Sequence, residues 1–141
     1  SDLTAWFLYP FFSSLTHRRS PKVKNILLWV LTGLVGALFL FSAFGKLSGN
    51  ADALKMAEGF GISASAFMTI GIIELISVVL FIIPRTGVLG TLLLAAYMGG
   101  AIATHVQHGQ DITAPLVIQM FIWIVAALRF PELTQRLLGK A

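Results

Sequence analysis

Long apolar segments recur along the chain, and none of them alternates between apolar and polar residues with a period of two. They cover residues 26–44, 62–83, 88–106 and 114–130. Each is close to the roughly 20 residues that a helix needs to cross about 30 Å of hydrocarbon. Strands of membrane barrels are shorter and alternate between lipid and lumen. The pattern therefore predicts four membrane-spanning helices.

Polar and helix-breaking residues separate these segments. "GKLSGN" closes the first, "PRTG" divides the second from the third, and "HGQDITAP" divides the third from the fourth. Pro84 cannot continue a helix, whereas Pro115 suits the start of one. Because short connections join neighbouring helices, we expect an all-α, integral membrane, antiparallel four-helix bundle.

Small residues gather on the first and third segments, where they would let helices approach closely. Gly33 and Ala37 lie four residues apart on the first segment, with Gly36 nearby. We expect these residues to pack against neighbouring helices. The corresponding residues of the third segment are Gly90, Ala95, Ala96, Gly99, Gly100, Ala101 and Ala103.

An aromatic and basic segment precedes the apolar part of the chain. Residues 1–25 include Trp6 and Tyr9, which suit the headgroup region of a bilayer. We interpret this segment as interfacial or docked on a partner. Residues 26–130 then form the transmembrane domain.

Two further short helices are expected outside the spans. Residues 51–60 predict a helix on the outer surface, with Asn50 as its N-cap and Gly59 as its C-terminal stop. Residues 131–141 predict an amphipathic cytoplasmic tail. Its inward residues would be Leu133, Leu137 and Leu138.

Composition supports a membrane protein. Of the 141 residues, 57% are hydrophobic and 11% are charged, whereas soluble domains carry about 25% charged residues. A soluble domain of this size has too large a surface to hide so many apolar side chains. The chain contains no cysteine, which excludes disulfides and thiolate metal sites within it.

The basic residues predict the orientation of the chain. Eight of the ten would lie on one side of the membrane, and only Lys46 and Lys55 on the other. By the positive-inside rule both termini are then cytoplasmic. The same rule explains the net charge of +4 without a nucleic-acid partner. The eight are Arg18, Arg19, Lys22, Lys24, Arg85, Arg129, Arg136 and Lys140.

One carboxylate interrupts the most apolar segment. Glu74 lies near the middle of the second span, with Gly71 and Ser77 on the same helical face. A charged group at this depth costs several kcal/mol unless it is paired, neutral or in contact with water. We therefore expect this face to point into the bundle.

Polar residues of the other spans are expected to join Glu74. Tyr97, Thr104 and His105 share a stripe on the third span. The set predicts a polar pocket open to the outer side, with Glu74 at its floor. The candidate ligand-binding residues are Glu74, His105, Tyr97, Lys46, Gln119 and Thr104.

Five of the six candidates also have a structural interpretation. Lys46 can extend to the headgroups, and Tyr97 can be a core residue with one satisfied hydroxyl. Gln119 can bond between helices, His105 can cap or lie at the interface, and Glu74 can make a structural hydrogen bond. The sequence leaves these alternatives open.

A metal site is a weaker alternative. His105 and His108 are three residues apart, and Asp111 follows closely. Two histidines and a carboxylate can hold zinc or iron, but this spacing is common by chance. We therefore expect no metal, with these histidines as the weak candidate.

Several short motifs together resemble the DoxX-like membrane proteins. They are "FSAFGKL", "MAEGFGIS", "IEL" within the second span, "PRTG", "GAIATH" and "LRFPEL", from about residue 38 to residue 133. The resemblance implies a bacterial or archaeal protein with four transmembrane helices in the cytoplasmic (inner) membrane. It also implies a link to quinone-linked oxidoreductases or to complexes that handle oxidative stress. The positions it implicates are Lys46, Glu74 and His105.

The sequence leaves three functions open. The first is an accessory subunit of a membrane redox system that binds a quinone or lipid-like molecule and is not an autonomous enzyme. The second is a non-catalytic assembly or anchor subunit, either in a complex with a protein partner or as a homo-oligomer. The third is a small proton or solute transporter, for which four helices are few without oligomerisation.

Overall fold

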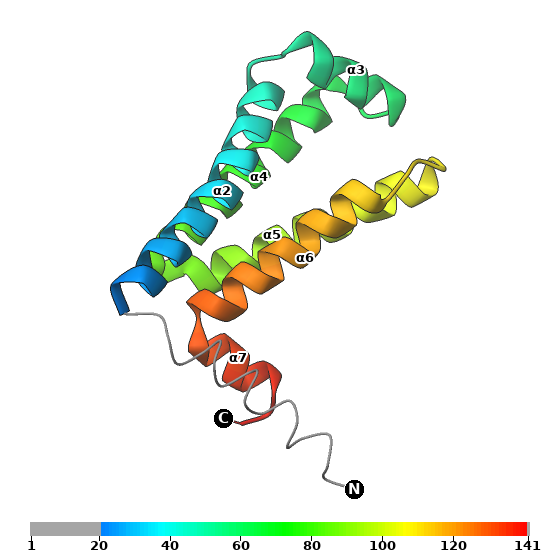
Figure 1. Ribbon diagram of the computed structural model, residues 1–141. Coiled ribbons are helices and arrows are strands. Elements are labelled where there is room, and N and C mark those ends of the chain that lie inside the picture. Colours follow the sequence, from blue (N-terminus) through cyan, green and yellow to red (C-terminus); the bar gives the residue numbers. More distant parts are fainter. Residues whose placement is uncertain (1–20, 141) are drawn as a thin grey trace, which may run out of the picture.

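The computed structural model describes residues 21–140, and every regular element in that range is helical (Figure 1). The predicted N-terminal segment lies outside the described residues except for its last five positions, which belong to the first described helix. The elements are α2 (Pro21–Leu47), α3 (Ala51–Gly59), α4 (Ala64–Ile82), the 3₁₀ turn η1 (Pro84–Thr86), α5 (Gly87–Gln107), α6 (Thr113–Arg129) and α7 (Pro131–Leu137).

Three stretches of helix are long and apolar enough to cross a membrane by themselves. They are Lys22–Leu47, Ala64–Ile82 and Pro84–Gln107. A fourth is reached if α6 and α7, which bend by 110° at their junction, count as one span. The chain is therefore a multi-pass membrane protein with three or four spanning helices in its described part.

Neighbours along the chain are also neighbours in space. α2 packs on α4, α4 on α5, and α5 on α6, whereas α2 and α6 share a much smaller contact. Figure 1 shows the α2–α4 pair and the α5–α6 pair meeting near α7 and diverging toward α3. We call these two extremities the α7 end and the α3 end.

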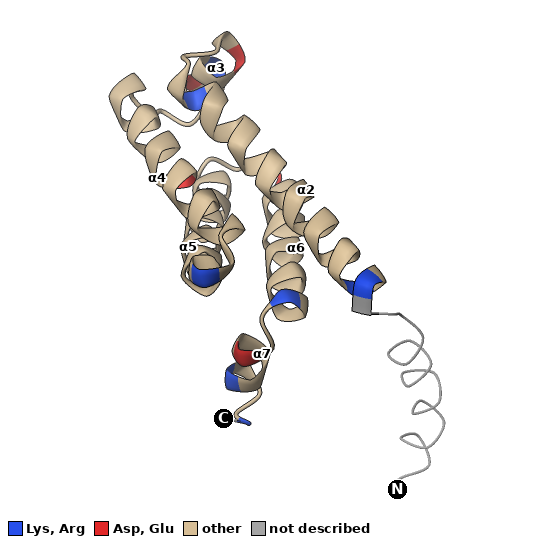
Figure 2. Cartoon of the chain, turned by 90° about the vertical axis from the view of Figure 1, so that its left-hand side faces the viewer, with Lys and Arg blue, Asp and Glu red and all other residues tan. Residues whose placement is uncertain are grey.

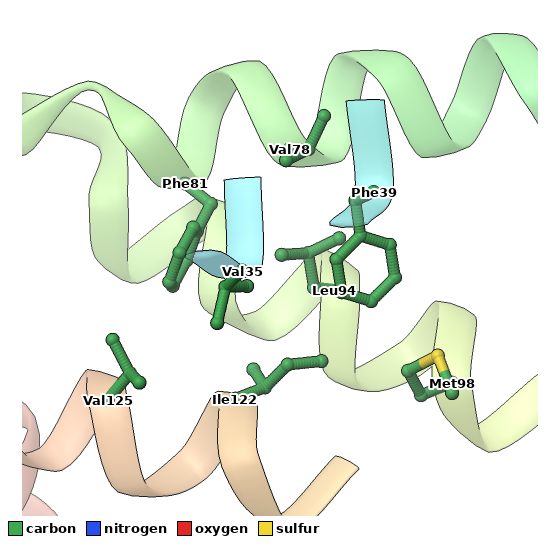
Figure 3. Packing of buried hydrophobic residues seen from close by; sticks show 8 residues of the cluster. All are labelled: Val35, Phe39, Val78, Phe81, Leu94, Met98, Ile122 and Val125. Carbon is green, nitrogen blue, oxygen red and sulfur yellow. The ribbon is translucent and has the colours of Figure 1, made fainter. Parts of the chain in front are cut away.

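A single apolar cluster holds the four long helices together. Many other large apolar side chains are exposed on the surface of the helices, and Phe41 is 82% exposed. Such a surface is unfavourable in water but suits lipid. The cluster comprises Val35, Phe39, Val78, Phe81, Leu94, Met98, Ile122 and Val125 (Figure 3).

Small residues allow close packing at only some of the predicted positions. A Cβ added at Gly90 would meet the backbone of Phe81, so α4 and α5 touch there without intervening side chains. At Gly36 it would lie 3.0 Å from Ile82 Cδ1. The prediction is wrong for Gly33, Gly99 and Gly100, where an added Cβ has nothing within 4 Å. Apolarity and small size predict that a residue suits a helix contact, but they do not select the face that is used.

The short helix α3 confirms one predicted end and corrects the other. Asn50 caps it, since its side-chain oxygen accepts from Asp52 N at 2.9 Å. Gly59 remains inside the helix, and Gly61 takes the left-handed conformation with φ of +66°. Glycine tolerates this conformation because it lacks a Cβ.

The predicted inward face of the C-terminal tail is largely wrong. Leu137 and Leu138 are 59% and 63% exposed, and Leu133 is only half-buried. The reason is the sharp bend after Phe130, which carries α7 away from the bundle.

Candidate ligand-binding site

A buried ion pair joins α2 to α4. The Nζ of Lys46 lies 2.8 Å from Oε2 of Glu74, and the two side chains are 9% and 1% exposed. Gly71, one turn before Glu74, permits the contact because a Cβ there would lie 2.9 Å from Lys46 Cβ. Figure 2 shows Lys, Arg, Asp and Glu mainly near the helix ends, with an acidic position within α4. Glu74 lies in the middle of α4, whereas Lys46 belongs to the last turn of α2. Pairing offsets part of the cost of burying each charge.

Two hydroxyl groups complete this cluster. Lys46 also donates to Ser42 Oγ at 2.6 Å, and the Tyr97 hydroxyl donates to Glu74 Oε2 at 3.1 Å. The Lys46 ammonium lies 5.5 Å from the ring centroid of Phe67 and 5.9 Å from that of Tyr97, within the range of cation–π attraction. The cluster links α2, α4 and α5 and carries no net charge when Lys46 and Glu74 are both ionised.

A cavity of about 320 Å³ lies beside this cluster, between α3, α4 and α5. Its volume is at the lower end of the range for small-molecule sites. Glu74 lies behind the wall formed by Lys46 and Tyr97, rather than on the floor as expected from the sequence. The lining residues are Lys46, Met56, Phe60, Ile62, Phe67, Ile70, Ala96, Tyr97, Gly100, Ala101, Thr104 and His105.

Two histidines close the α3 end of this region. Nδ1 of His105 donates to Ala101 O at 2.7 Å, and Nδ1 of His108 donates to Thr104 O at 2.9 Å. A carbonyl can only accept, so Nδ1 carries the proton in each ring. The ring of Phe60 packs on both, with centroid separations of 4.9 and 5.5 Å. Only His105 lines the cavity.

The weak metal candidates are not assembled into a site. Within residues 21–140 no group of three or more His, Asp or Glu side chains is placed to hold a metal ion. Asp111 instead accepts hydrogen bonds from the hydroxyl and the backbone N–H of Thr113, at 2.7 and 2.9 Å. These two bonds hold the pKa of Asp111 below its usual value, the hydroxyl bond having the larger effect.

The other two predicted residues take different positions. Thr104 lines the cavity, but its hydroxyl donates to Gly100 O at 2.9 Å. Gln119 lies away from the cavity and donates to Ala95 O at 3.0 Å, which links α6 to α5. Its Oε1 is buried and has no partner in the described part of the chain. The structure therefore brings Lys46, Glu74 and Tyr97 together and leaves Gln119 outside.

Two side chains that the sequence does not single out make hydrogen bonds between or within these helices. Ser42 stands one turn before Lys46, and that spacing on one helical face was the available signal. The sequence predicts for Arg129 only a part in orientation, yet its guanidinium donates to Phe81 O and to Ile82 O, the latter at 2.6 Å. These carbonyls end α4 and lack helical partners. No local pattern around Arg129 reveals that contact.

The fold and the site together define a small multi-pass membrane protein with a buried charged pair beside a cavity. The model of the DoxX-like family matches residues 30–128. The chain therefore belongs to the DoxX-like family, as its motifs indicated. Comparison with curated proteins and with solved structures gives no match.

Proposed function

We propose that the protein binds a small amphipathic molecule of the quinone type in the cavity between α3, α4 and α5. The observation that carries this proposal is the position of the Lys46 and Tyr97 side chains. Both belong to the buried polar cluster and both form the cavity wall. An apolar slot with a few convergent polar groups is the usual form of a small-molecule site.

The chemistry of the wall suits a carbonyl group. Lys46 has three N–H donors, and bonds to Ser42 and Glu74 use two of them. The third is available to a ligand oxygen. Apolar residues such as Phe60 and Ile70 line much of the remaining surface and suit a ring. Because Glu74 balances the charge of Lys46, we expect a neutral ligand.

An accessory role in a membrane redox system follows from the groups at the site. They can form hydrogen bonds and carry protons, and a chain without cysteine offers no thiol for electron transfer. Electrons would therefore pass between the bound ligand and a partner protein. Family membership agrees with this role, since quinone-linked complexes are what the resemblance implies.

The charge distribution supports an orientation for this site. We place the protein in the bacterial cytoplasmic membrane as an antiparallel four-helix bundle with both termini cytoplasmic. In this arrangement the α7 end faces the cytoplasm and the cavity opens toward the outer side. The described basic residues near the α7 end are Lys22, Lys24, Arg85, Arg129, Arg136 and Lys140.

The two histidines provide a matched test of the proposal. Each bonds through Nδ1 to the carbonyl four residues before it, and each contacts the ring of Phe60, but only His105 lines the cavity. We expect His105→Ala to weaken binding of a short-chain quinol analogue about tenfold, the loss of one good hydrogen bond that a quinol hydroxyl would donate to the unprotonated Nε2. We expect His108→Ala to leave the dissociation constant unchanged. Calorimetric titration of the protein in lipid nanodiscs measures both.

Two results would contradict the proposal. One is wild-type protein that binds no quinone analogue. The other is His105→Ala and His108→Ala binding with equal affinity. Either result would favour the assembly role, in which the polar cluster serves only to join α2, α4 and α5.

A further inference from the structure

Two further cavities lie along the contact between α2 and α6, away from the proposed quinone site. The first, of about 290 Å³, is at the α7 end and is lined by Asn25, Leu28, Trp29, Thr32, Pro84, Arg129, Phe130 and Glu132. The second, of about 110 Å³, is lined only by apolar residues: Val35, Leu38, Phe39, Val117, Ile118, Phe121 and Ile122. We call the first the polar cavity and the second the apolar cavity.

The two cavities follow one another along the same helices. On α2, Thr32 lines the polar cavity and Val35 the apolar one, about 4.5 Å apart along the helix axis. On α6, Arg129 and Ile122 are about two turns apart. A molecule that fills both therefore has its polar part at the α7 end and its apolar part toward the middle of the span. This is the orientation of a lipid in one leaflet.

The polar cavity contains both signs of charge. Bonds to Phe81 O and Ile82 O use two of the five N–H donors of Arg129, which leaves three. The side chains of Glu132 and Asn25 are exposed and have no hydrogen-bond partner among residues 21–140. The guanidinium suits a phosphate, and the Glu132 carboxylate suits an ammonium group that donates hydrogen bonds. Trp29 lies beside Arg129, 5.8 Å from ring centroid to Cζ, as aromatic residues do at a membrane interface.

We propose that the α2–α6 contact binds one phospholipid with a primary-amine headgroup, of the phosphatidylethanolamine class. Its phosphate lies against Arg129, its ammonium lies against Glu132, and a few methylene groups of one acyl chain occupy the apolar cavity. Phosphatidylglycerol offers no cation to Glu132. Phosphatidylcholine carries a quaternary ammonium, which cannot donate a hydrogen bond. The site therefore distinguishes among lipids that share the same acyl chains.

Native mass spectrometry of the full chain tests the headgroup assignment. Purified protein is titrated with phosphatidylethanolamine, phosphatidylcholine and phosphatidylglycerol of identical chains. We expect phosphatidylethanolamine to bind about tenfold more tightly than the other two, the effect of one charge-assisted hydrogen bond. Glu132→Gln should abolish the preference. The matched control Glu58→Gln, an exposed carboxylate on α3 at the opposite end, should retain it.

A second variant tests whether the ligand is a lipid or only a soluble phosphate compound. Val117 is more than half exposed at the edge of the apolar cavity, so Val117→Phe narrows that cavity without disturbing the buried core. We expect this change to weaken lipid binding about tenfold, as for a few buried methylene groups. Soluble phosphoethanolamine should bind far more weakly than the lipid.

Three outcomes would overturn the proposal. The first is equal binding of the three lipids by the wild-type protein. The second is a preference that survives in Glu132→Gln. The third is unchanged lipid binding by Val117→Phe, together with phosphoethanolamine binding as tight as that of the lipid, which would assign the polar cavity to a free phosphate compound.

Discussion

Replacing Lys46 with Met is expected to lower the free energy of unfolding by about 3–5 kcal/mol, the range for removing one partner of a buried ion pair. Glu74 is 1% exposed and would lose the ammonium 2.8 Å from its Oε2. Only the Tyr97 hydroxyl would remain as a hydrogen-bond donor to that oxygen. Helicity followed during unfolding by sodium dodecyl sulfate in mixed micelles measures the change.

A double-mutant cycle separates the pair from its individual residues. Apolar residues of similar volume often replace a buried pair at little cost. We therefore expect Lys46→Met combined with Glu74→Leu to be more stable than Lys46→Met alone. Lys55→Met, at an exposed position of α3, is the matched control and should leave the free energy of unfolding nearly unchanged. If Lys46→Met unfolds at the wild-type detergent concentration, the pair contributes nothing to stability and our description of the cluster fails.

A second large loss of stability is expected from a substitution at Gly90, where the backbones of α4 and α5 are in contact. A methyl group there overlaps the backbone of Phe81 and the carbonyl carbon of Leu80, which cannot move aside as a flexible side chain can. Gly90→Ala should therefore force the two helices apart. We expect it to lower the free energy of unfolding by about 3 kcal/mol, the upper part of the range for overpacking. The same detergent unfolding experiment measures it.

Gly99 on the same helix provides the control for this prediction. It is exposed, and an added Cβ has no neighbour within 4 Å. Gly99→Ala should leave stability unchanged or raise it by up to about 1 kcal/mol, because alanine favours the helix. Equal stabilities of Gly90→Ala and Gly99→Ala would show that the α4–α5 contact is looser than the structure indicates.

The sequence was sufficient to locate the long helices because apolar length is a strong and local signal. The predicted segment 62–83 and the helix Ala64–Ile82 differ by one or two residues at each end. The predicted first segment, residues 26–44, is shorter than the helix, since α2 begins at Pro21 and includes Lys22 and Lys24. Charged residues near a span end reduce hydropathy without ending a helix, so a pattern based on apolarity stops early there.

The sequence was less informative about which residues meet. It selected Lys46, Glu74 and Tyr97 because polar groups inside a span need partners, and the structure places these three in contact. It also selected Gln119, which the rotation of α6 turns toward Ala95 instead. Helical spacing gives the face of one residue relative to another on the same helix. It does not give the rotation of one helix relative to its neighbour.

The polar cluster can be both structural and functional. Bonds from Lys46 and Tyr97 to Glu74 join three helices, and the same two side chains form the cavity wall. Variants of these residues therefore report on folding and binding at once. Positions that line the cavity without taking part in the polar cluster are better suited to test binding alone.

Gly100 is such a position, and it supports the most direct test of ligand binding in the cavity. It lines the cavity, whereas its neighbour Gly99 does not, and an added Cβ at either has no neighbour within 4 Å. The measurement is the dissociation constant of a short-chain quinone analogue for Gly100→Leu and Gly99→Leu in nanodiscs. We predict at least about a tenfold loss for Gly100→Leu, because its side chain fills space the ligand needs, and wild-type affinity for Gly99→Leu. Equal affinities in the two variants would contradict binding in this cavity.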